Sequence, residues 1–236
     1  MYFDYPVSVR YSDLSENGCL SDTAILDMMQ EAALVCDPVE RGELRTQKYA
    51  WALCGWKYCV RRRPEWAEKL TVRTWLRTME RHTCDREYVI FDEAGKQLIA
   101  ATSRWLLLNF ATGRVADVTD EIRSRYTFDH ERAMGEDVPR TIDPVGAEKP
   151  AFVYTVMQRD IDTLHHMNNL YYLALAREAL PAELVAHQFE NVEVVYRRQI
   201  KKGETVRFLY SVDDGKHLVR IMNSEETVCH ALIRFF

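Results

Sequence analysis

A carboxylate and an imidazole lie four residues apart in the segment DIDTLHHMNN, residues 160–169. Asp162 and His166 are the residue types that exchange protons with water and with reacting groups at neutral pH. The segment ends where an apolar helix is predicted to begin. The unpaired backbone N–H groups of a helix N-terminus favour negative charge. This combination suits a reaction in which water attacks and an oxygen gains charge.

Each of these residues also has an ordinary structural explanation. Asp162 can cap the following turn, as Asp often does before helices, and this is the simpler interpretation when it is taken alone. His166 can be a partly buried, hydrogen-bonded histidine, and His165 is expected to be structural or exposed. Asn168 and Asn169 are favoured as helix caps over catalytic groups. From the residues alone, both interpretations stay open.

Two helices are predicted from caps and apolar spacing. The second runs from Asn169 to about Leu180 and is ended by Pro181. Its run LYYLALA is apolar nearly all round, which indicates a helix enclosed by protein. The first begins after cap residues at Ser21 and Asp22, and its apolar residues recur at i, i+3 and i+4: Ile25, Met28, Met29, Ala32, Ala33 and Cys36.

Strands are predicted after each helix from alternating apolar and polar residues. After the first helix these are 70–78 and 84–110, the latter read as two strands joined at 93–95. After the second helix they are 191–198, 205–211, 217–223 and 227–236, with a hairpin turn at Asp214-Gly215. A helix followed by long antiparallel strands therefore occurs twice.

An internal repeat supports this duplication. The stretch 9–22 aligns with 157–169, which pairs Asp13 with Asp160 and Cys19 with His166. Ser15 then replaces the second acid, so the matching place in the first copy, with Asn17 nearby, is interpreted as structural only. One buried helix wrapped by a long antiparallel sheet is the hot-dog arrangement. We therefore predict an α+β fold of two tandem hot-dog domains.

The predicted domain boundaries follow from the composition between the copies. Residues 127–150 hold three prolines, two glycines and six acidic residues, which is typical of a linker crossing the surface. The N-terminal hot-dog is then 1–126 and the C-terminal hot-dog 151–236. Whether two chains pair as a homodimer stays open, because tandem copies already mimic a dimer of single hot-dogs.

Composition and charge exclude several classes of function. The chain has 236 residues, a net charge of -5 and a pI of about 5.8, which does not fit nucleic-acid binding. Its six cysteines form no C-x-x-C pair, so no zinc site is expected, and nothing indicates another metal or a cofactor. No signal peptide and no bilayer-spanning apolar segment are visible, and we expect a cytoplasmic protein.

The segment DIDTLHHMNNLYY (160–172) resembles the active-site segment of acyl-acyl-carrier-protein thioesterases, the plant and bacterial enzymes that end fatty-acid synthesis. Their segment runs roughly D-L-D-x-N-x-H-V-N-N-x-x-Y. Further motifs of that family resemble 64–76 (PEWAEKLTVRTWL), 101–114 (ATSRWLLLNFATGR) and 196–198 (YRR), in the same order. The resemblance covers most of the chain. It implies a double hot-dog fold and hydrolysis of fatty acyl thioesters of acyl carrier protein without a cofactor.

The resemblance also implies roles for individual residues. The family's catalytic Asp falls on Asp162 and its His on His166, whereas its Asn falls on Leu164. Its acid after Y-R-R falls on Gln199, and the Cys once proposed as nucleophile falls on Ile200, so a thiol mechanism is not supported. Asp162 is then the base or, as an alternative, the nucleophile. His166 orients or polarises the substrate, and Gln199 can hold a water without taking its proton.

The remaining site residues are predicted to contact the substrate or its carrier. The thioester oxygen is expected on backbone N–H groups around Met167 to Asn169, with Leu164 and Asn168 beside the substrate. In this family the N-terminal copy shapes the acyl tunnel, to which Met28 and Met29 can contribute. Basic residues that could steer an acidic carrier protein, or be solvated strand ends, are Arg61, Arg62, Arg63, Arg197, Arg198, Lys201 and Lys202.

Two competing functions use the same fold. An acyl-CoA thioesterase would differ in the carrier that it accepts. A protein that binds acyl thioesters without cleaving them would explain Leu164 and Gln199, which lack the chemistry of the family residues that they replace.

Overall fold

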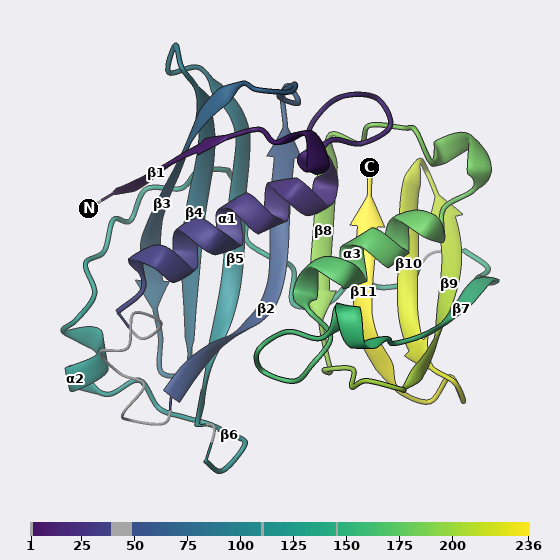
Figure 1. Cartoon of the computed structure of the whole chain (residues 1–236). Helices are drawn as coiled ribbons and strands as arrows, with labels where there is room; N and C mark the ends of the chain where they lie inside the picture. Colours follow the sequence, from purple (N-terminus) through teal and green to yellow (C-terminus); the bar gives the residue numbers. More distant parts are fainter. Residues whose placement is uncertain (1, 39–48, 110, 145) are drawn as a thin grey trace. The chain divides into compact units, whose positions relative to one another are not determined.

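The computed structural model describes residues 2–38, 49–109, 111–144 and 146–236 (Figure 1). Two compact units are distinguished by their internal contacts, one ending at Val138 and the other beginning at Pro139. The predicted boundaries at 126 and 150 stay predictions. No helix in the described part of the chain is long and apolar enough to cross a membrane.

In the first unit, helix α1 lies along an antiparallel sheet with the strand order β1-β3-β4-β5-β2, and β6 pairs with β5 (Figure 1). Ser21 caps α1, because its Oγ accepts a hydrogen bond from Ala24 N at 3.2 Å. The elements are β1 Phe3–Ser8, α1 Asp22–Cys36, β2 Tyr49–Val60, β3 Lys69–Met79, β4 Thr83–Asp92, β5 Gln97–Asn109, β6 Arg114–Val115 and α2 Asp120–Arg123.

The second unit repeats this plan with helix α3 and the strand order β8-β11-β10-β9-β7, again antiparallel. The elements are β7 Lys149–Thr155, α3 Asn169–Glu178, β8 Asn191–Tyr196, β9 Thr205–Asp213, β10 Lys216–Asn223 and β11 Cys229–Phe235. The predicted hairpin turn is confirmed, with positive φ at Asp214 and Gly215. The expectation that α3 is enclosed all round is wrong, because Leu170, Tyr171 and Leu175 are only half-buried.

The two copies share one loop geometry ahead of their helices. Ser15 N donates to Cys19 O at 2.8 Å in the first copy, and Asp162 N donates to His166 O at 2.9 Å in the second. The residues that flank these pairs, on the side away from the loop tip, form isolated antiparallel bridges: Leu14 with Leu20, and Ile161 with Met167. These bonds keep a constant spacing between the copies, which supports the alignment of Cys19 with His166.

The segment predicted as a linker is packed against the protein. Val138 and Ile142 are both buried, 4% and 3% exposed. Trp75 Nε1 donates to Glu131 O at 2.9 Å, and Asp129 N donates to Leu76 O at 3.0 Å. Its prolines and acidic residues predict a segment that runs over the surface. In the structure, buried apolar side chains and ion pairs also hold this segment against the protein.

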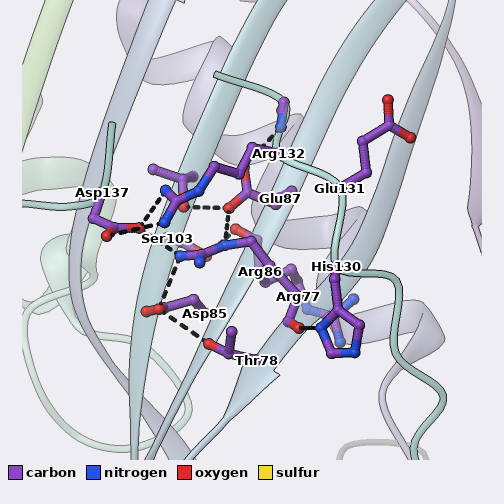
Figure 2. Close-up of polar contacts among 12 residues, drawn as sticks. Arg77, Thr78, Asp85, Arg86, Glu87, Ser103, His130, Glu131, Arg132 and Asp137 are labelled. Carbon is purple, nitrogen blue, oxygen red and sulfur yellow. Dashed lines mark hydrogen bonds and ion pairs between the residues drawn. The ribbon is translucent and has the colours of Figure 1, made fainter. Parts of the chain in front are cut away.

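An ion-pair network holds residues 130–137 on the sheet of the first unit (Figure 2). Arg77 donates to Glu87 Oε1 at 2.7 Å, to Asp85 Oδ2 at 3.0 Å and to Asp137 Oδ1 at 2.5 Å. Glu87 also accepts from Ala133 N at 3.0 Å. The side chains of Arg77 and Glu87 are 8% and 1% exposed. Burial raises the pKa of Glu87, and the hydrogen bonds from Ala133 N and Arg77 act in the opposite direction.

Replacing Arg77 by Met should therefore destabilise the protein strongly. Removing one partner of a buried ion pair leaves an uncompensated charge and costs about 3–5 kcal/mol. Urea denaturation followed by circular dichroism should show a lower midpoint for Arg77→Met. The matched control is Lys69→Met, since Lys69 and Glu93 pair at 3.1 Å with side chains 69% and 71% exposed. Equal midpoints for the two variants would contradict this account of the network.

The loop repeat generates a second prediction, about backbone strain. His165 has φ +65° where the first copy has Gly18 at φ +74°. A left-handed φ is costly for a residue with a Cβ and free for glycine, by about 1 kcal/mol. His165→Gly should raise the melting temperature, and Gly18→Ala should lower it, although no atom of the described residues lies within 4 Å of the added Cβ. Shifts of the same sign in both variants would argue against strain at this position.

Candidate active site

The loop between β7 and α3 is held at both ends by Asp160, which is 2% exposed. Its Oδ2 accepts from Met157 N at 2.7 Å and from Tyr154 Oη at 2.8 Å. Its backbone oxygen accepts from Asn168 N at 2.8 Å. A buried carboxylate needs such donors. Asp160 therefore positions the intervening loop, a role that sequence reasoning missed although the repeat paired it with Asp13.

Asp162 and His166 face each other across this loop through the backbone bond described above. Asp162 Oδ1 accepts from Leu164 N at 2.8 Å and from His166 N at 3.4 Å. Within the described residues, Oδ2 of Asp162 makes no hydrogen bond, and Nδ1 of His166 is buried without a partner. The predicted turn-capping role of Asp162 is thus present, and it leaves one carboxylate oxygen and one ring nitrogen for other work.

The chain after β8 is bonded to the start of α3 by two tyrosines. Tyr172 Oη donates to Arg198 O at 3.4 Å and accepts from Ile200 N at 3.1 Å. Tyr196 Oη donates to Asn169 O at 3.0 Å. Burial raises the pKa of both phenols, so they remain protonated donors at neutral pH. Their positioning role was not predicted, since an apolar helix run gives no signal for a hydroxyl bond across the fold.

These bonds correct part of the predicted oxyanion site. Met167 N donates to Ile200 O at 2.8 Å and Asn168 N donates to Asp160 O, so neither is free for a substrate oxygen. Of the three predicted N–H groups, Asn169 N alone has no partner among the described residues. Asn168 is the helix cap, because its Oδ1 accepts from Leu170 N at 3.0 Å.

Gln199 is exposed, between two residues whose backbone is fixed by Tyr172. Its equivalent in the first copy is Arg63, because Leu20 N donates to Pro64 O at 2.7 Å just as Met167 N donates to Ile200 O. Arg63 is bonded to Asp22 Oδ1 at 2.7 Å. The Arg63–Asp22 ion pair of the first copy is thus replaced by Gln199 and Asn169 at the equivalent positions of the second copy.

The predicted docking residues differ in what they contact. The prediction that Arg63 docks the carrier is wrong, because its side chain is 7% exposed and forms an ion pair with Asp22. Arg62 pairs with Glu68 at 2.7 and 2.8 Å. The remaining members are exposed, namely Arg61, Arg197, Arg198, Lys201 and Lys202.

The predicted acyl-contacting residues lie in different surroundings. Met28 and Met29 are 4% and 0% exposed in the core of the first unit. Leu164 is 48% exposed at the tip of the 160–168 loop. Their contact with an acyl chain stays a prediction. No group of three or more His, Cys, Asp or Glu side chains in the described ranges could hold a metal ion.

Comparison with known proteins identifies the family to which the two halves of the chain are similar. The family model described as acyl-ACP thioesterase N-terminal domain matches residues 3–126, and the one for the acyl-ACP thioesterase C-terminal domain matches residues 147–234. The chain is 24% identical to an oleoyl-acyl carrier protein thioesterase of Arabidopsis thaliana, covering 89% of this chain and 63% of that protein. It is 24% identical to a palmitoyl-acyl carrier protein thioesterase of Gossypium hirsutum, covering 99% and 60%. It thus spans less than two thirds of these curated relatives.

Solved structures agree in fold. An acyl-ACP thioesterase from Bacteroides thetaiotaomicron superposes with a TM-score of 0.88 at 21% identity, covering 100% of this chain and 97% of that one. The 12:0-ACP thioesterase from Umbellularia californica gives 0.84 at 21% identity, covering 99% and 96%. The predicted tandem hot-dog fold is confirmed. With both family models matched in order along a chain of this fold, the protein belongs to the acyl-ACP thioesterase family.

Proposed function

We propose that this chain hydrolyses fatty acyl thioesters of acyl carrier protein to free fatty acid and the carrier thiol. The observation that supports the proposal is that one loop holds two polar atoms without a hydrogen bond among the described residues, Oδ2 of Asp162 and the buried Nδ1 of His166. A buried polar atom without a partner is costly unless a ligand or water satisfies it. Family membership and the names of the relatives supply the substrate class.

In the proposed reaction, Asp162 acts as general base. It takes a proton from a water molecule as the water oxygen attacks the thioester carbon. The carbonyl oxygen gains negative charge, which the Asn169 N–H at the start of α3 can stabilise. His166 orients or polarises the substrate. When the carbon–sulfur bond breaks, the proton held by Asp162 passes to the leaving thiolate, so that acid and thiol are released and the enzyme is restored.

Three departures from the family pattern shape this mechanism. Ile200 offers no thiol, so a cysteine nucleophile at that position is ruled out. Gln199 can orient the attacking water by hydrogen bonds but cannot take its proton. Leu164 cannot donate to a substrate oxygen. The loss of one such donor typically costs ~10²–10³ in rate, so we expect slow turnover compared with a site that keeps the amide.

Carrier recognition belongs to the same proposal. Four basic residues close to Gln199 in sequence are exposed: Arg197, Arg198, Lys201 and Lys202. A positive surface on a chain of net charge -5 would steer an acidic carrier.

An acyl-CoA substrate on the same site is the first alternative. Binding without cleavage is the second, and it is favoured by Leu164 and Gln199. The cytoplasmic location and a homodimer stay predictions.

Turnover assays test the proposal directly. The purified chain should release free fatty acid from acyl carrier protein thioesters faster than from the same acyl group on CoA. Asp162→Asn should reduce turnover at least ~10³-fold, because the amide keeps the Oδ1 acceptor for the loop but cannot accept a proton from water. Fatty acid release across a panel of chain lengths is the readout.

Matched controls come from the first copy. Ser15→Ala and Cys19→Ala change the residues equivalent to Asp162 and His166 and should leave turnover unchanged. His166→Ala should lower turnover with its thermal unfolding retained. Binding of an acyl thioester with no release from any carrier would establish the non-catalytic alternative, and faster release from CoA would establish the first.

Restoring the amide at the loop tip gives a further prediction. Leu164→Asn should raise kcat by roughly 10-fold or more, since a donor at this position can stabilise the charged oxygen in the transition state. Leu164→Ala is the control, because it removes the same exposed apolar group without adding a donor. An equal rate in both variants would show that position 164 does not contact the reacting oxygen.

A further inference from the structure

The second unit has an open pocket of about 420 Å³ on the sheet face opposite α3. Arg177 of α3 lies over the Phe235 ring, at 5.6 Å from its centroid, so Phe235 faces the helix. Side chains alternate along a strand, which puts Leu232 on the other face. There Ile142 packs with Leu232, Val195 and Leu218 and covers part of the sheet. The pocket lies beside this cover, with Ile142, Leu232 and Cys229 among its apolar lining.

Three arginines line the same pocket: Arg197, Arg198 and Arg220. Arg197 and Arg198 are exposed, and neither has an acidic partner among the described residues. Arg220 is paired with Glu148, and among the described residues both its Nε and Glu148 Oε1 are buried without a hydrogen bond. Asp143 also lines the pocket. Counting both acids, positive charge remains in excess, in a chain whose net charge is -5.

The first copy shows that the fold does not require free arginines here. Arg61 N and Arg62 N both donate to Leu98 O, at 2.8 and 3.4 Å, and Arg197 N and Arg198 N both donate to His230 O, at 2.8 and 3.2 Å. The four residues therefore hold equivalent places at the ends of equivalent strands.

The acids that follow these arginines behave differently in the two copies. Glu68 binds the Arg62 guanidinium through both carboxylate oxygens. Both acids also accept from the backbone N–H three residues before them, Glu68 from Glu65 N at 2.7 Å and Glu204 from Lys201 N at 3.0 Å. Among the described residues, the difference is that Glu204 does not bind the guanidinium of Arg198. The described part of the second copy thus lacks the internal neutralisation of this arginine that the first copy has.

We propose that this pocket binds a phosphate group of a small organic ester. Guanidinium groups match phosphate oxygens with paired N–H donors, and several of them around one concavity suit a group with several acceptor oxygens better than a two-oxygen carboxylate. The apolar lining suits the carbon part of such an ester. The size lies in the range of small-molecule sites, about 300–1,000 Å³.

One chain segment contributes both to the pocket and to the candidate active site. Arg198 precedes Gln199, and its backbone oxygen accepts the Tyr172 bond that fixes the start of α3. A phosphopantetheine arm, which carries the acyl group on both carrier protein and CoA, is the phosphate source that this placement favours. That choice of source rests on the proposed function. The phosphate site itself does not.

Calorimetric titration tests the pocket without using catalysis. The probes are 4′-phosphopantetheine, pantetheine and inorganic phosphate. The intact chain should bind phosphopantetheine roughly 10-fold or more tighter than pantetheine, since charge-assisted hydrogen bonds from guanidinium groups to phosphate oxygens are stronger than neutral ones. The double variant Arg197→Gln/Arg198→Gln should lose this difference. Both side chains are exposed, so thermal unfolding should not change.

Arg61→Gln is the matched control, because it removes one positive charge at the equivalent strand end, and it should keep the full preference for phosphopantetheine. Inorganic phosphate binding as tightly as phosphopantetheine, and lost in the double variant, would support the pocket with free phosphate as its source. Equal affinity for phosphopantetheine and pantetheine, or a preference that persists in the double variant, would overturn the proposal. Because no step depends on hydrolysis, absent turnover would count only against the proposed function.

Discussion

The buried carboxylate of Asp160 is the constraint on which the candidate site depends. It accepts from the residues before the loop, while its own backbone oxygen accepts from the helix cap, so the two ends of the loop are tied to one residue. A charge buried to 2% exposure is tolerated only with such donors, and each donor is thereby fixed in place. Asp162 and His166 acquire their facing positions from this frame, and their side chains do not have to bond to each other to hold it.

The same frame in the first copy separates scaffold from chemistry. Asp13 accepts from Arg10 N at 2.8 Å, as Asp160 does from Met157 N, yet Ser15 and Cys19 replace the acid and the imidazole. The left-handed position between them is glycine in the first copy and histidine in the second. A loop that tolerates backbone strain only where it also carries ionisable side chains fits the general association of strain with functional sites.

Much of the fold could be predicted because local signals agreed with it. The cap at Ser21, the turn at Asp214-Gly215 and the alternation along the strands each depend on neighbours in sequence. The errors concern contacts between distant segments. The backbone N–H groups of Met167 and Asn168 were predicted to bind the substrate oxygen, but they donate to Ile200 O and Asp160 O. Arg63 was predicted to be exposed, but it is buried in an ion pair with Asp22. No periodicity in the chain encodes those partners.

The comparison between copies also limits what the fold can explain. Where both copies share a backbone bond, as at Arg62 and Arg198, any difference in the surrounding charges cannot be a requirement of that bond. Arg62 and Arg63 are each neutralised by an acid, whereas Arg198 has no acidic partner in the described part of the chain and Gln199 has no charge to neutralise. An unpaired guanidinium in a concavity gains nothing for folding, since an exposed charge adds little stability. The positive charge at Arg197 and Arg198 is therefore better explained by a ligand than by the hot-dog fold.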